Sequence, residues 1–107
     1  MSEVLVVLCT TSSEDESATL ARRLVEARLA ACVNIVPQVR SIYSWQGELQ
    51  DDRESLMVIK TSPARWEELR SHLREAHSYD TPEILRLDAS GDRAYLAWLL
   101  EQTLPAS

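Results

Sequence analysis

The sequence predicts an α+β sandwich, and three features support that prediction. Apolar runs rich in β-branched residues alternate with amphipathic helical segments along the 107 residues. These segments occur in the order β-α-β-β-α-β, and one more helix follows them. A chain of this length buries about 65% of the surface that its unfolded form exposes. We therefore expect residues 1–107 to form a single domain that needs neither disulfide bonds nor a structural metal.

The first strand and the first helix have clear signatures. Residues 4–9 read VLVVLC, an apolar run typical of a strand that is covered on both faces. Ser13 and Glu16 have the spacing of a capping box, which predicts that a helix begins here. Apolar side chains then keep a helical spacing from Leu20 to Ala31.

A long hairpin is predicted next. An extended segment from Cys32 to Trp45 is interrupted by Pro37, which cannot donate a ladder hydrogen bond, so the strand is at an edge or bulged there. The chain turns at residues 46–48, and we expect the charged residues 51–54 to form a solvated hairpin tip. Residues 56–61 return as a strand.

The second half repeats the pattern. Ser62 and Pro63 are typical of a helix start, and apolar residues at helical spacing continue to a helix end near His77. Residues 84–87 form a short strand, and Asp92 is placed to cap a third helix. The whole order is that of a ferredoxin-like sandwich, in which two helices cover one face of a four-stranded antiparallel sheet.

The second face of this sheet needs a cover of its own. Both faces of residues 4–9 and 56–59 carry apolar side chains, and one additional helix is too small to hide them all. Another copy of the same chain is the simplest cover, so we expect a homo-oligomer.

Composition excludes several classes of function. The only glycines, Gly47 and Gly91, are too far apart for a phosphate-binding loop or a dinucleotide fingerprint. A net charge of −6, with no basic run longer than Arg22-Arg23, argues against a nucleic-acid partner. No stretch approaches the ~18 apolar residues of a spanning helix, which argues against a membrane partner. Because residues 1–3 enter the first apolar run without a basic leader, we expect a cytoplasmic protein.

The two cysteines do not predict a closed zinc site. Cys9 and Cys32 are separated by 22 residues, whereas structural zinc sites use close cysteine pairs. We expect reduced thiols, and buried apolar packing is the simpler role for each, most clearly for Cys32. His72 and His77 would point about 140° apart if one helix carried both, so they would not chelate a metal together.

Residues 77–83, HSYDTPE, are the more suggestive stretch for a metal site. They place the imidazole of His77 near the carboxylates of Asp80 and Glu83, and copper(II) and zinc(II) accept such ligands. The alternative is an ordinary loop in which Asp80 caps a turn, Tyr79 packs and His77 interacts with the end of the preceding helix. Composition alone favours this alternative.

Five motifs follow one another in order along the chain: AACVNIVP at 30–37, SIYSWQG at 41–47, ESLMVIKT at 54–61, HSYDTPEI at 77–84 and YLAW at 95–98. Together they resemble the divalent-cation tolerance family, CutA, over nearly the whole length. The resemblance implies a non-enzymatic homotrimer, assembled like the PII signalling proteins, that responds to divalent metal ions and binds copper(II) or a similar ion.

The resemblance also implies specific residues. It assigns Cys9, His77 and Glu83 as metal ligands. The chain departs from the family pattern at Ser78, where that pattern has proline. In the implied trimer, a neighbour's sheet edge pairs with the arm at residues 39–45. We expect Tyr43, Trp45 and Trp98 to lie at or near those subunit contacts.

The sequence leaves two other functions open beside metal binding. A PII-like signalling trimer would hold a small anionic effector between subunits and present residues 48–54 to a partner, although these acids disfavour nucleotides. An acylphosphatase-type enzyme ranks last, because the acids of the predicted connection Thr10–Glu16 would repel a phosphate substrate.

Overall fold

The structure is a computed structural model that describes residues 3–105. Its elements follow in the order β1 (Val4–Thr11), α1 (Glu14–Glu26), β2 (Cys32–Trp45), β3 (Glu48–Thr61), a short 3-10 helix (Pro63–Arg65), α2 (Trp66–Ala76), β4 (Leu85–Ala89) and α3 (Arg93–Gln102). This order confirms the predicted α+β sandwich with an additional C-terminal helix. Met1 and Ser2, on which the expectation about a leader depends, lie outside the described residues.

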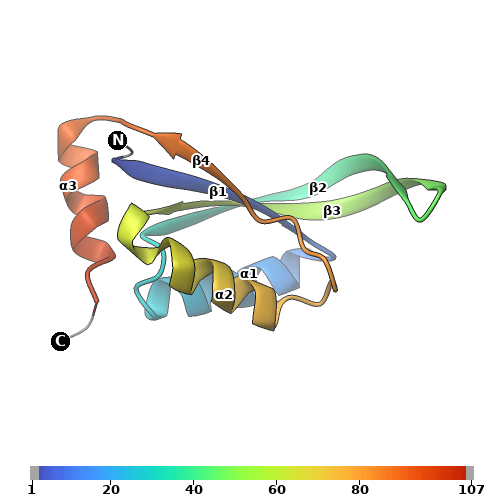
Figure 1. Ribbon diagram of the computed structural model, residues 1–107, viewed down its shortest axis with the longest axis horizontal. Coiled ribbons are helices and arrows are strands. Elements are labelled where there is room, and N and C mark those ends of the chain that lie inside the picture. Colours follow the sequence, from blue (N-terminus) through green and yellow to red (C-terminus); the bar gives the residue numbers. More distant parts are fainter. Residues whose placement is uncertain (1–2, 106–107) are drawn as a thin grey trace.

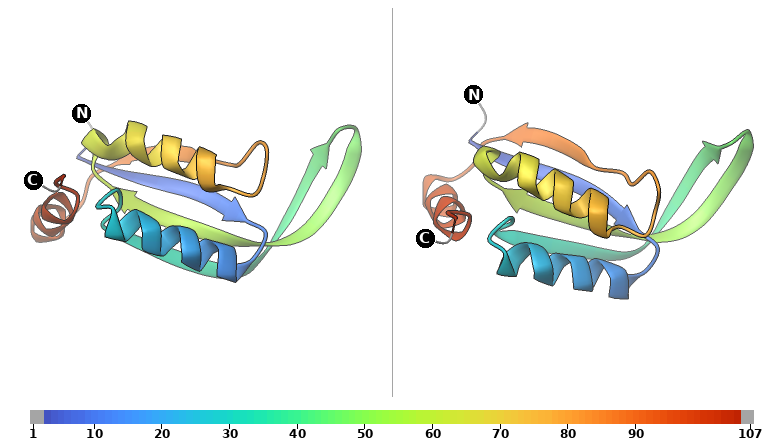
Figure 2. Two further views of the ribbon diagram at one scale, coloured as in Figure 1. Left: turned by 90° about the horizontal axis from the view of Figure 1, so that it is seen from below. Right: turned by 60° about the horizontal axis from the view of Figure 1, so that its bottom comes forward.

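One antiparallel sheet organises the molecule, with the strand order β2-β3-β1-β4. Helices α1 and α2 lie side by side across one face of it (Figures 1 and 2). Alternate residues of the central strands point at these helices and form the main core. Fully buried members of this core are Leu5, Val7 and Cys9 of β1, Met57 and Ile59 of β3, Leu24 of α1, and Leu69 and Leu73 of α2.

The opposite face of the sheet is apolar and largely uncovered. Val6 and Leu8 of β1 point to this side, because their neighbours in the strand point at the helices. The register places Leu87 opposite Val6 and Leu85 opposite Leu8, and these leucines are 51% and 56% exposed. Helix α3 covers one end of this face, where Leu96 and Leu99 pack with Val4.

Strands β2 and β3 continue beyond the sheet body as a two-stranded arm that bends away from it (Figure 2). The bend coincides with a register shift between Val36 and Val39, beside Pro37. Gln38 there has a φ of 57°, which is typical of a bulge residue. Both alternatives predicted for Pro37 therefore hold, because β2 is an edge strand and is bulged there.

The predicted turn at residues 46–48 is confirmed, whereas the prediction of a hairpin tip at residues 51–54 was wrong. The turn is at Gln46 and Gly47, whose φ values of 52° and 83° are those that a two-residue hairpin turn requires. Asp51 and Asp52 instead pair with β2 in the middle of the arm. A strand of charged residues can form here because both faces of the arm are exposed in the single chain. A run of charged residues is therefore not by itself evidence of a turn.

The helix starts follow their local sequence signals, but the prediction that the first helix continues to Ala31 was wrong: α1 ends at Glu26, and Arg28 adopts a φ of 60° in the turn that follows. The Ser13 side chain accepts a hydrogen bond from the Glu16 backbone N–H at 3.0 Å, and Asp92 caps α3. His77 terminates α2 with an extended backbone, so His72 and His77 do not share a helix. None of the helices within residues 3–105 is long and apolar enough to cross a membrane.

Candidate functional site

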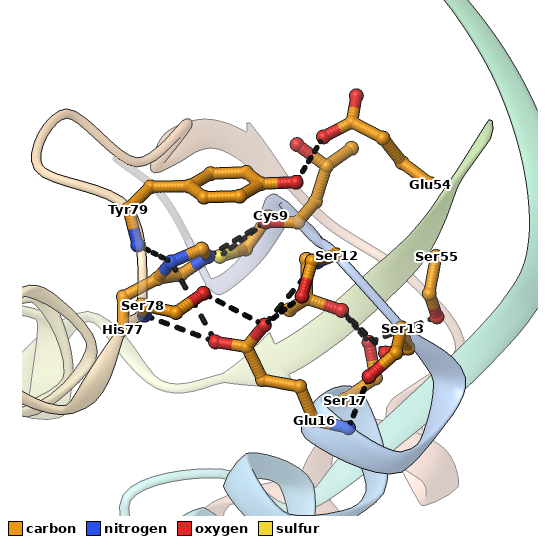
Figure 3. Close-up of polar contacts among 12 residues, drawn as sticks. Cys9, Ser12, Ser13, Glu16, Ser17, Glu54, Ser55, His77, Ser78 and Tyr79 are labelled. Atoms are coloured by element: carbon orange, nitrogen blue, oxygen red, sulfur yellow. Dashed lines mark hydrogen bonds and ion pairs between the residues drawn. The ribbon is translucent and has the colours of Figure 1, made fainter. Parts of the chain in front are cut away.

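The candidate site lies where the loop between α2 and β4 meets the end of β1 and the start of α1 (Figure 3). His77 leaves α2 with φ −74° and ψ 144°, and its backbone N–H still donates to the carbonyl of Leu73. This change from helical to extended backbone turns the imidazole toward the strand and buries it completely.

Both ring nitrogens of His77 are engaged. Nε2 lies 2.7 Å from the carbonyl oxygen of Thr10, and a carbonyl only accepts, so Nε2 carries the hydrogen. Nδ1 accepts the backbone N–H of Tyr79 at 3.0 Å. His77 is therefore a neutral imidazole in one defined tautomer, and each nitrogen has to give up a partner before it can bind a metal.

Cys9 is buried beneath this loop. Its side chain points at the helices and has no exposed surface. Burial raises the pKa of the thiol to about 12, and the negative charges of Glu83 and Glu16 add to that effect. Because metals bind the thiolate, a thiol in this environment is a poor ligand at neutral pH.

Glu83 is the most accessible of the three predicted ligands. It is exposed and follows Pro82 in the loop that leads to β4. Its charge is close enough to act on Cys9, so the structure does bring these two residues into one neighbourhood. Asp80, which belongs to the same sequence stretch, is also exposed.

Glu16 is a central residue of this neighbourhood that the sequence indicated only as part of a helix cap. Its carboxylate accepts hydrogen bonds from the backbone N–H and the hydroxyl of Ser78, at 3.0 and 2.9 Å. It also accepts the backbone N–H and the hydroxyl of Ser12, at 3.2 and 2.9 Å. Burial raises the pKa of Glu16, but these donors outweigh burial and the net effect is a lowered pKa.

Tyr79 forms the other side of the loop. Its ring lies 4.7 Å from that of His77, between centroids, and its hydroxyl donates to Glu54 at 2.8 Å. Burial and the Glu54 carboxylate raise the pKa of the phenol, which therefore remains a donor. An ordinary loop was predicted to pack Tyr79, and local sequence carries no signal for a partner 25 residues away, Glu54.

The predicted ligands do not form a ready metal site in the single chain. Among residues 3–105, no group of three or more His, Cys, Asp or Glu side chains is placed to hold an ion. Glu83 acts electrostatically on Cys9, but Cys9 and His77 are buried, and both ring nitrogens of His77 are already hydrogen-bonded. Cys32 lies on the other sheet face, where it is half-buried rather than fully buried as expected, and both cysteines are free thiols.

Fold and site together define a small α+β protein with a carboxylate-rich loop site and an uncovered sheet face. The family model for the CutA1 divalent ion tolerance protein matches residues 5–102. The chain belongs to this family.

Known relatives agree with that assignment. The divalent-cation tolerance protein CutA of Thermus thermophilus is 50% identical over 99 residues, which are 92% of this chain and 96% of the relative. The chloroplastic protein CutA of Arabidopsis thaliana is 41% identical over 92% of this chain and 55% of its own length. A solved structure of the Thermus thermophilus protein superposes with a TM-score of 0.90 at 48% identity, covering 94% of this chain and 98% of that one.

Proposed function

We propose that this protein is a cytoplasmic homotrimer that binds copper(II) or a similar divalent cation as part of a response to metal, without catalysing a reaction. Glu83 is the first ligand, because it is exposed and its carboxylate suits such an ion. His77 joins when its ring leaves Thr10, and Cys9 joins only if the loop opens further. The family name and the relatives' names support the cation class.

The proposed oligomer rests on one observation, which is the apolar sheet face that the single chain leaves uncovered. Leucines of β4 lie beside half-buried side chains of β1 and β3, and the resulting surface runs across the sheet. The two edge strands, β2 and β4, are also available for pairing. A contact between unlike edges forms a closed ring when the rotation between subunits closes, and the proposed trimer is such a ring.

The arm supports the same assembly. Ile42, Tyr43, Trp45 and Leu49 are exposed on it, although large apolar side chains are normally covered. Trp98 is similarly exposed on α3, where it packs only partly on Tyr95. We propose that these side chains contact neighbouring subunits.

Calorimetric titration with copper(II) tests the proposed ligands. Glu83→Ala and His77→Ala are compared with the wild type and with Glu101→Ala, which removes the same charge from the exposed face of α3. We expect weaker binding for the first two variants and unchanged binding for the control. Equal affinity for all four proteins would exclude Glu83 and His77 as ligands.

A small effector is the second candidate, and one cleft favours it. Between the start of α1 and the bend of the arm lies a cleft whose lining includes Ser12, Ser13, Gln38 and Arg53. Hydroxyls, an amide and a guanidinium suit an anionic or polar molecule, as a PII-like regulatory protein would need. Glu14 and Glu54 also line the cleft and disfavour nucleotides. A thermal-shift screen with nucleotides and with carboxylates would detect such a ligand as a raised Tm.

A further inference from the structure

The Glu16 carboxylate joins two segments that are far apart in the sequence. Ser12 belongs to the turn before α1, and Ser78 belongs to the loop after α2; each donates one backbone and one hydroxyl hydrogen to it. Figure 3 shows both serines converging on Glu16. The side chain of Glu16 is 17% exposed, and the two serines that bind it lie at the surface.

The Ser78 end of this connection lies next to His77. Ser78 itself is exposed, whereas the imidazole beside it has no exposed surface. His77 Nδ1 is held by the N–H of Tyr79, so both residues that follow His77 contribute to the closed arrangement. Glu16 Oε2 also lies 3.9 Å from Nδ1 of His77, so the carboxylate is close to the imidazole ring.

We propose that Ser78 and Glu16 form a latch that controls access to His77. With the latch made, the loop at residues 78–83 stays against the start of α1 and the imidazole stays on Thr10. With the latch broken, the loop moves away and exposes the ring to solvent and to cations. The consequence for metal rests on the proposed function, but the closure of His77 does not.

Two features make the latch a property of Ser78 in particular. A serine supplies two donors to the same carboxylate, and both bonds are charge-assisted, which makes them stronger than neutral ones. A proline at this position would supply neither donor. The ψ of 144° at His77 is already that of a residue preceding proline, so Ser78→Pro removes both bonds without forcing His77 out of its observed conformation.

Carbethoxylation of histidine by diethyl pyrocarbonate, followed peptide by peptide in the metal-free protein, tests the latch. We expect His77 to react slowly in the wild type and roughly tenfold faster in Ser78→Pro, the change in open population that the loss of such hydrogen bonds produces. Ser78→Ala keeps the backbone donor and should give an intermediate rate. His72 provides an internal reference, and Ser90→Ala, an exposed serine in the connection before α3, is the matched control.

Glu16→Gln provides a second route to the same result, in case Ser78→Pro fails to fold. It retains the shape of the side chain but removes the charge that strengthens all four bonds, so His77 should again react faster. Unchanged rates of His77 carbethoxylation in Glu16→Gln and in the folded Ser78 variants would overturn the latch, regardless of the result of copper titration.

Copper titration of the same variants separates the latch from the proposed function. Faster copper uptake in Ser78→Pro, in step with faster carbethoxylation, supports both. Faster carbethoxylation without any copper binding supports the latch and refutes the metal role of His77.

Discussion

Tyr79 donates its phenolic hydrogen to Glu54 at 2.8 Å and thereby ties the loop between α2 and β4 to β3 at the base of the arm. The contact connects the candidate site with the part of the molecule that we propose to meet neighbouring subunits. Loss of this hydrogen bond is therefore expected to affect both the loop after α2 and the base of the arm.

Replacement of Tyr79 by phenylalanine should lower the free energy of unfolding by about 1 kcal/mol, because Glu54 loses a donor. Burial and Glu54 raise the pKa of this phenol, so its contribution is complete below the unfolded value of about 10 and is lost as pH rises above it. Urea unfolding at one protein concentration measures the difference. Tyr95→Phe, an exposed tyrosine on α3, is the control, and equal losses in both variants would contradict the prediction.

The Cys9 thiol should resist alkylation in the folded protein. Burial raises its pKa to about 12, with smaller contributions from Glu83 and Glu16, so almost no thiolate exists at pH 8. In a Cys32→Ser variant, where Cys9 is the remaining cysteine, iodoacetamide labelling at pH 8 should proceed only as the protein unfolds. The same variant in urea shows full reactivity. Prompt labelling in native buffer would show that the site is open.

Glu16 should make the protein sensitive to acid. Its pKa is lowered in the folded state, because the donors from Ser78 and Ser12 outweigh burial. The stability it contributes is therefore present above its ordinary pKa of 4.5 and is lost as pH falls below that value. Compared with Glu16→Gln, the wild type should lose more unfolding free energy between about pH 5 and pH 3.

Glu14→Gln is the matched control for this experiment. Glu14 lies in the same first turn of α1 and is exposed, so its replacement removes the same charge while keeping the hydrogen bonds of Glu16 to Ser12 and Ser78. Parallel pH profiles for the wild type and Glu16→Gln would refute the role assigned to this carboxylate.

The uncovered sheet face should mediate self-association. Light scattering at micromolar concentration is expected to give three times the chain mass of 12.1 kDa. Leu87→Lys places a charge on the face and should reduce that mass, because burial of an unpaired ammonium is costly. Val25→Lys makes the same change on an exposed position of α1 and should leave the mass unchanged. A monomeric wild type would remove the basis for the trimer.

Much of the fold could be predicted from local signals. The VLVVLC run, the Ser13 cap and the switch to extended structure at Cys32 each depend on residues close in sequence, and all agree with the structure. The arm shows where such signals fail. The turn at Gln46 and Gly47 was predicted, but the charged residues 51–54, predicted to form a hairpin tip, instead belong to β3.

The candidate site was less predictable, because its contacts join distant segments. Cys9, His77 and Glu83 were assigned as ligands by resemblance, and that assignment stays a prediction; among them, the structure relates Glu83 to Cys9 through its charge. Sequence spacing carried no information on the partners of the His77 ring, which lie on β1 and in the loop itself. It also could not show that Glu16 reaches Ser78, 62 residues away.

By itself, the sequence determined the order of strands and helices and the presence of more apolar strand surface than two helices can cover, since hydrophobic period and capping are local properties. Only the tertiary structure decided which hydrogen-bond partners the side chains of His77 and Glu16 have. Hydrogen-bond partners depend on which loops meet in space, and the packing of α1 and α2 on the sheet brings Ser12 and Ser78 to the same carboxylate.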